Sequence, residues 1–189
     1  MTTLEELRTA MRDDPWLAEA LPRAGKELST LFPAAARNCG REPLDEAPSW
    51  TADEAARALL LAAAPAGEHA DVYRYGDADE KRAVLKALPL LPIGDAGVPL
   101  LHDALRTNDT RLVAAALGPC ARHLDDAAWR HGVLKCVFMG VPLAAVHGLT
   151  ERADGELAAM LAAFAKERTA AGRDVPADAL ELLARLQEV

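Results

Sequence analysis

Apolar residues recur along this chain at intervals of three and four positions, the spacing that places them on one face of an α-helix. The pattern is clearest near the C-terminus, where apolar residues at positions 157, 160, 161 and 164 form one stripe that Arg168 continues. No segment alternates apolar and polar residues as a half-buried strand does, and no Asn-Gly or Asp-Gly hairpin is flanked by such segments. The pattern therefore predicts an all-helical chain.

Capping patterns predict where these helices begin. At three places a Thr or Asp is followed three residues later by Glu, which is the spacing of a capping box. These capping boxes predict helices that begin after Thr3, Thr51 and Asp77. Single capping residues predict further helices after Asp14, Asp109, Asp125 and Asp154. Gly140 with Pro142, and Gly172, are expected to end two of them.

Proline and glycine also predict breaks and connectors. A helix from Arg23 to Phe32 is expected to kink or stop at Pro33, because proline removes a helical hydrogen bond. The segments 38–50 and 65–77 carry Gly, Pro and mixed charge, and are predicted to be connectors. In the last helix, which Pro176 opens, Leu180, Leu183 and Leu186 are expected to face inward.

Short helices with short connections predict antiparallel helix pairs. We predict an all-α fold in which such pairs stack into a right-handed array of HEAT or armadillo type. It would form a single domain over residues 1–189, with a looser N-terminal part at about 1–50. Because no internal repeat is evident, a single compact helical bundle is the alternative architecture.

The net charge is −8, which disfavours nucleic acid and anionic membrane surfaces as partners. The first residues have neither the basic nor the apolar region of a signal peptide, so none is expected. The longest apolar stretch, 129–143, is interrupted by Lys135 and Pro142, so no membrane-spanning helix is expected. Three cysteines without a framework spacing fit a reducing environment, and the predicted location is cytoplasmic.

Lys135 stands in the middle of that apolar stretch. On a helical wheel, Lys135 forms a row with His131 and Met139. Small residues at 132, 136 and 140 form a second row beside it. The opposite side of the helix is broad and apolar, and includes Trp129 and Phe138. Three interpretations are open. The lysine can extend its stem past the edge of a core, anchor a carboxylate or phosphate, or act as a Schiff-base or general-base amine whose pKa is lowered by desolvation.

Other candidate chemistry is weaker. The residues Cys120, His123, His131 and Cys136 are of zinc-ligand types, but His131 and Cys136 diverge by about 140° around one helix. No metal and no cofactor is therefore predicted. The segment 106–109 suits a helix end and turn, or a polar cluster that faces a groove. The segment 166–173 suits a solvated last turn, or one from which Glu167 and Arg168 point inward. There is no G-x-S-x-G, P-loop or G-x-G-x-x-G motif.

The order and spacing of several segments resemble the EboA family of metabolite-traffic proteins. The matching segments are 77–92 (DADEKRAVLKALPLLP), 104–108 (ALRTN) and 128–176, with a looser match at Arg37, Gly40-Arg41 and 49–61. The best match spans 77–176. The chain departs from the family pattern at 118–123, where GPCARH replaces a segment with Asn-Pro-Tyr-Pro, and at Arg130, which replaces an asparagine.

The resemblance implies a role in moving a small natural product or its precursor between compartments, and no catalytic activity is assigned to such proteins. We therefore expect a non-catalytic protein that binds a small polar or anionic metabolite, or partner proteins of the same biosynthetic cluster. The alternatives are an interaction scaffold, and an isomerase or lyase that uses Lys135 or His131 as a base. The candidate ligand-binding residues are Arg106, Asn108, Trp129, His131, Lys135, Glu167 and Arg168.

Overall fold

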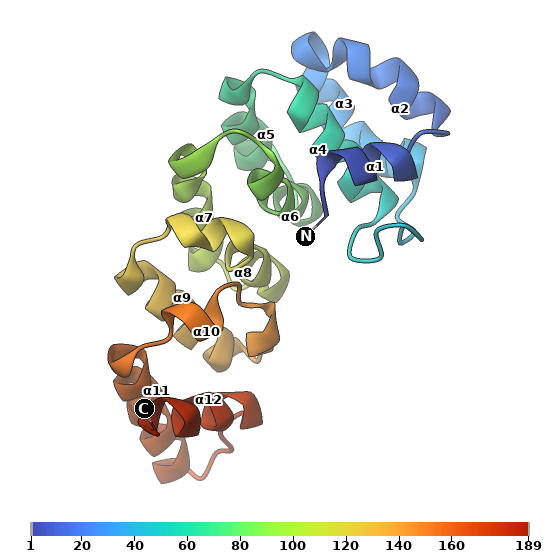
Figure 1. The fold of residues 1–189 in the computed structure, drawn as a ribbon. Coiled ribbons are helices and arrows are strands. Elements are labelled where there is room, and N and C mark those ends of the chain that lie inside the picture. Colours follow the sequence, from blue (N-terminus) through green and yellow to red (C-terminus); the bar gives the residue numbers. More distant parts are fainter. Residues whose placement is uncertain (1, 189) are drawn as a thin grey trace. The chain divides into compact units, whose positions relative to one another are not determined.

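The structure, a computed structural model, describes residues 2–188, and its helices pack against one another in pairs (Figure 1). In that range the only β-type pairing is one isolated bridge between Pro43 and Thr51, so the prediction of an all-α fold is confirmed. The chain divides into two compact units, residues 1–100 and 101–189. The HEAT-like stacking and the single domain stay predictions.

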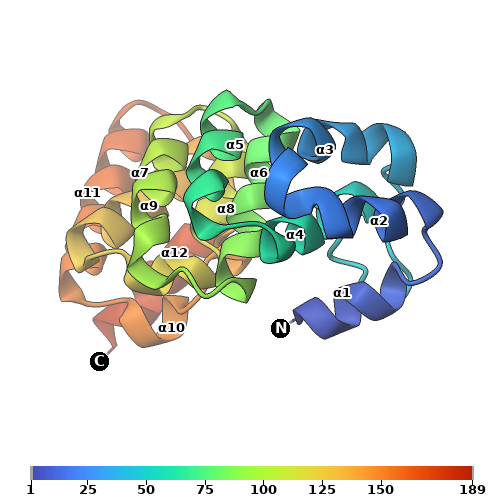
Figure 2. The ribbon, with the colours of Figure 1, turned by 90° about the horizontal axis from the view of Figure 1, so that it is seen from above.

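In the first unit, α4 is the central helix. Every residue from Ala52 to Leu61 on it is buried, and it packs against α3 and α6 (Figure 2). The capping boxes predicted at Thr3, Thr51 and Asp77 are all formed. The helices of this unit are α1 (Leu4–Ala10), α2 (Pro15–Ala20), α3 (Ala24–Cys39), α4 (Ala52–Ala63), α5 (His69–Tyr75) and α6 (Ala78–Ala87).

Two expectations for this unit were wrong. The segment 65–77 is not a plain connector, because it contains α5; this helix has no side-chain cap, but Val72 and Tyr73 are buried. The helix expected to kink or stop at Pro33 instead runs through it to Cys39, and its backbone departs from helical geometry earlier, at Glu27. Packing of the apolar face of α3 against α4 compensates for the hydrogen bond that proline cannot make.

In the second unit, α9 packs against α8 and α11, and α11 pairs with α12. Gly140 ends α9 in a left-handed conformation (φ 72°), as the sequence predicted. No helix among the described residues is both long and apolar enough to cross a membrane. The helices are α7 (Val98–Arg106, which begins before the unit boundary), α8 (Thr110–Ala116), α9 (Asp126–Met139), α10 (Leu149–Arg152), α11 (Gly155–Ala170) and α12 (Ala177–Gln187).

Two apolar side chains expected to be buried are exposed. Phe138 on α9 is 71% exposed, because the buried stripe of that helix runs through 129, 132, 133, 136 and 137. Leu180 on α12 is 47% exposed, because this helix presents Ala179 and Leu182 to its neighbours instead. In both helices the inward face lies about one residue away from the position that the wheel suggested.

Candidate functional site

A pocket of about 340 Å³ lies between α7 and α9 in the second unit. It brings together three of the seven candidate residues, Arg106, His131 and Lys135. It also includes His102, which the sequence analysis did not single out. The signal was present, because His102 precedes Arg106 by four residues and so shares its face of a helix. The lining is His102, Leu105, Arg106, Ala128, His131, Gly132 and Lys135.

Lys135 is held by the end of the neighbouring helix. Its Nζ donates a hydrogen bond to the carbonyl oxygen of Leu105 at 2.7 Å. Because α7 ends at Arg106, this carbonyl is one of the last four in the helix, which have no intrahelical donor. An ammonium group has three donor hydrogens, so two are left for other acceptors. The lysine thus caps α7 and still presents a charge to the pocket.

The other two candidate residues in the pocket retain donor capacity. His131 Nδ1 lies 2.7 Å from the carbonyl oxygen of Ala127, which makes Nδ1 the protonated nitrogen and leaves Nε2 without a partner among the described residues. Arg106 is exposed, and its closest acidic contact is Asp103 at 3.7 Å, a weak surface pair. Its guanidinium can therefore turn toward a bound anion.

The charge of this pocket differs from that of the whole chain. Its lining includes a lysine, an arginine and two histidines, and no carboxylate, whereas the chain carries a net charge of −8. Gly132, on the same wall, is buried, and an added Cβ would lie 2.9 Å from the Leu117 side chain, so this glycine lets α9 pack closely against its neighbours. The basic lining suits a small anion or a polar molecule rich in hydrogen-bond acceptors.

The remaining four candidate residues lie elsewhere. Asn108 is exposed in the turn between α7 and α8. Trp129 is fully buried and is not part of the pocket lining. The guanidinium of Arg152 lies 4.8 Å from its ring centroid, and its indole Nε1 has no hydrogen bond to any described residue. Glu167 is exposed. Arg168 donates two hydrogen bonds, at 2.9 and 2.7 Å, to the carbonyl oxygen of Asp174.

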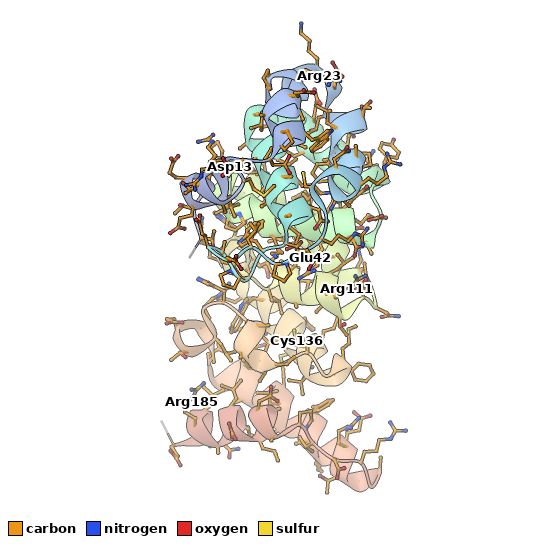
Figure 3. The ribbon with its side chains drawn as sticks, turned by 90° about the vertical axis from the view of Figure 1, so that its right-hand side faces the viewer. Asp13, Arg23, Glu42, Arg111, Cys136 and Arg185 are labelled. Atoms are coloured by element: carbon orange, nitrogen blue, oxygen red, sulfur yellow. The ribbon has the colours of Figure 1, made fainter. Side chains whose placement is uncertain are left out.

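The residues considered for zinc do not assemble. Cys136, labelled on α9 in Figure 3, is buried, and burial raises the pKa of its thiol to about 12. Cys120 is also buried, and burial raises its thiol pKa. Across residues 2–188, no three His, Cys, Asp or Glu side chains are grouped as metal ligands would be.

Comparison with protein families gives the chain its context. The family model described as metabolite traffic protein EboA matches residues 30–184, which is most of the chain. The chain belongs to the EboA family. Membership suggests a role in metabolite traffic, and the matched region includes the whole α7–α9 pocket. Neither a curated protein nor a solved structure matches the chain.

Arg130 and the segment 118–123, where the sequence was expected to depart from the EboA pattern, have structural roles here. Arg130 Nη2 lies 2.5 Å from Asp154 Oδ2, and its Nη1 lies 2.9 Å from Glu156 Oε2, so this arginine joins α9 to the start of α11. The segment 118–123 contains a short 3-10 helix, and Arg152 donates a hydrogen bond to its Ala121 carbonyl oxygen at 2.8 Å. Both form contacts within the second unit.

Within the region matched to EboA, the first unit contains a buried charged cluster that the sequence analysis missed. Arg57 is almost fully buried; its Nη1 lies 2.5 Å from Asp53 Oδ2, and its Nε donates to the carbonyl oxygen of Phe32 at 3.1 Å. Glu54 is also buried and pairs with Arg82 and Lys86. Burial lowers the pKa of Lys86. Charges at helical spacing usually indicate a solvated face, so their burial depended on tertiary packing.

Proposed function

We propose that this EboA-family protein is a non-catalytic carrier that binds a small anionic or polyhydroxylated metabolite in the α7–α9 pocket during natural-product traffic. The basic lining of that pocket, in a chain of net charge −8, is the observation that carries the proposal. In this view Lys135 and Arg106 form charge-assisted hydrogen bonds to the ligand, and His131 adds a hydrogen bond. The volume of about 340 Å³ is at the small end of the range for ligand pockets.

The first experiment is native mass spectrometry of the protein purified from its own host, followed by denaturation and analysis of released small molecules. We expect a stoichiometric, acidic or hydroxyl-rich metabolite. A metabolite-free protein that still fails to bind any cluster metabolite added afterwards would contradict the carrier role.

Once a ligand is identified, Lys135→Met tests the pocket. Loss of one charge-assisted hydrogen bond is expected to weaken binding about tenfold or more. Lys166→Met is the matched control, because Lys166 is an exposed lysine on α11 outside the pocket. Unchanged affinity in Lys135→Met, or an equal loss in Lys166→Met, would place the ligand elsewhere.

The second candidate function is a scaffold that binds enzymes or a membrane partner encoded in the same cluster. In such a scaffold, Phe138, which is 71% exposed on α9, would lie at the contact with the partner. In this case Phe138→Ser would abolish capture of a purified cluster protein. Leu180→Ser, which changes another exposed apolar residue, would not.

An enzyme that uses Lys135 or His131 as a base is the third alternative. Such chemistry needs a second titratable group placed to exchange a proton with the base or with the substrate. His102, His131 and Lys135 share the pocket, but no hydrogen bond joins their side chains in the described chain. Turnover of the co-purified metabolite by the wild type, lost in both His131→Gln and Lys135→Met, would favour the enzyme over the carrier.

A further inference from the structure

A second pocket, of about 320 Å³, lies in the first unit between α3 and α5. One wall carries Glu68, Asp71, Val72 and Tyr75, which recur at helical spacing along α5 and the turn before it. The opposite wall comes from α3, with Ser29, Phe32 and Pro33, and the end of the pocket is formed by Gly76 and Glu80. The α7–α9 site shares no residue with it.

The polar groups around this pocket are mostly hydrogen-bond acceptors. Pro33 has no N–H, so the carbonyl oxygen of Ser29, four residues earlier in the helix, lacks its usual donor. The side chains of Glu68 and Asp71 take part in no hydrogen bond or ion pair among residues 2–188. Among the described residues, no lysine, arginine or histidine lines the pocket. A ligand that donates hydrogen bonds and carries positive charge would satisfy all three acceptors.

Glu80 differs from the other two carboxylates because it is already engaged. It accepts a hydrogen bond from the backbone N–H of Asp77 at 3.1 Å in the capping box of α6. Its other oxygen lies 3.9 Å from Nη2 of the buried Arg57. Glu80 is therefore fixed at the end of the pocket, and Arg57 partly balances its charge. The negative charge that no cation balances is that of Glu68 and Asp71.

One aromatic ring is open to a ligand. Tyr75 is 81% exposed, whereas Phe32 is buried and the guanidinium of Arg57 already lies 5.5 Å from its ring centroid. The face of an exposed aromatic ring attracts a cation modestly. Apolar and aromatic lining of this kind suits an organic cation with a hydrocarbon body, whereas a bare metal ion would need several converging oxygen ligands.

We propose that the α3–α5 pocket binds a small organic ammonium compound. Its N–H groups bond to the Ser29 carbonyl oxygen and to the carboxylates of Glu68 and Asp71, and its hydrocarbon part packs against Tyr75, Val72 and Pro33. This ligand class is opposite in charge to the one proposed for the α7–α9 pocket. An experiment that tests one site therefore does not test the other.

The test is an NMR titration of the full-length protein with benzylammonium at low ionic strength, followed through backbone amide shifts. We expect saturable shifts confined to α3, α5 and the start of α6. Benzyl alcohol, which has the same ring without the charge, is expected to shift these signals much less. Equal binding of the alcohol, or no saturable shift in this region, would overturn the proposal.

Variants at exposed or half-buried positions test the contacts without disturbing the core. Tyr75→Ala is expected to weaken benzylammonium binding about twofold to fivefold, which is the scale of one exposed cation–π contact. The double variant Glu68→Gln/Asp71→Asn is expected to weaken it about tenfold. Phe138→Ala and Asp45→Asn/Glu46→Gln change exposed residues outside the pocket and serve as matched controls. If the variants and the controls weakened benzylammonium binding equally, the effect would come from the overall charge of the protein, and the proposed site would be wrong.

Discussion

Lys135 and Leu105 are thirty residues apart in the sequence, and a hydrogen bond of 2.7 Å joins the ammonium of the first to the carbonyl oxygen of the second. The contact explains a lysine in the most apolar stretch of the chain. The side chain is half-buried, and its charge meets the carbonyl end of α7, where a positive charge is favourable. The same amine lies in the wall of the basic pocket, so a structural and a binding role are compatible.

Lys135→Met should lower the free energy of unfolding by about 1–2 kcal/mol, because a charge-assisted hydrogen bond is lost and the Leu105 carbonyl is left without its donor. Urea denaturation of the ligand-free protein measures this. Lys166→Met, at an exposed site, is expected to stay within about 0.5 kcal/mol of the wild type. An unchanged urea midpoint in Lys135→Met would contradict the capping role.

The buried pair of Arg57 and Asp53 predicts a large effect on stability. Arg57→Met leaves the Asp53 carboxylate buried without its cation, and a loss of about 3–5 kcal/mol is expected. The double variant Asp53→Asn/Arg57→Met should lose less than the sum of the two single variants, because the unpaired charge is removed. Chemical denaturation of all four proteins gives the coupling energy.

The exposed pair of Arg8 and Glu5, 3.7 Å apart, is the control for that cycle. Both side chains are mostly in water, so removing either should change stability by less than about 0.5 kcal/mol. Strictly additive effects at Arg57 and Asp53 would show that the two groups do not stabilise each other.

Asp154 predicts a dependence of stability on pH. Its hydrogen bond with Arg130, together with the backbone N–H of Leu157, holds the pKa of this carboxyl below its usual value. The unfolded chain then binds this proton at higher pH than the folded one, so acidification favours unfolding. The stabilisation is complete above about pH 5 and is lost as pH falls below about 4.

Asp154→Asn isolates the charge, because asparagine is also a good N-cap. The variant should be about 1 kcal/mol less stable than the wild type at pH 7, and the difference should shrink steadily as the pH falls below about 4, through the lowered pKa of Asp154. Urea unfolding at several pH values measures it. Asp125→Asn, at the N-cap of α9, changes a carboxylate whose hydrogen bond is to the backbone N–H of Ala128, and is expected to be nearly neutral. A difference for Asp154→Asn that is independent of pH would argue against the ion pair.

The cysteines predict slow thiol chemistry in the folded state. Burial is the main cause that raises the pKa of Cys39 and of Cys136 to about 12, and Cys120 is buried as well. Because the thiolate is the reactive form, a thiol reagent at pH 8 should label the native protein slowly. In denaturant, all three cysteines should react at once. If one cysteine of the native protein were labelled quickly, that cysteine could not be buried as described.

The candidate site was only partly predictable. His131 and Lys135 are four apart on one helix, so their shared face follows from periodicity alone. That Arg106 and His102 from α7 line the same pocket depends on how two helices pack, which no local pattern specifies. Trp129 shows the converse, because its place on the wheel fitted a ligand wall or a core equally well. Packing buried it with Arg152 over its ring.

The sequence by itself determined the helical class and most helix starts, because capping residues and apolar periodicity act within a few neighbouring positions. It also determined the net charge, and the order of segments that relates the chain to EboA. Tertiary structure decided what depends on distant neighbours. It stabilised α5 in a segment rich in turn residues, carried α3 through Pro33, and buried Arg57 with Asp53. It also formed two pockets of opposite charge. Each pocket lies between two helices that are apart in the sequence, so it exists only once those helices pack together.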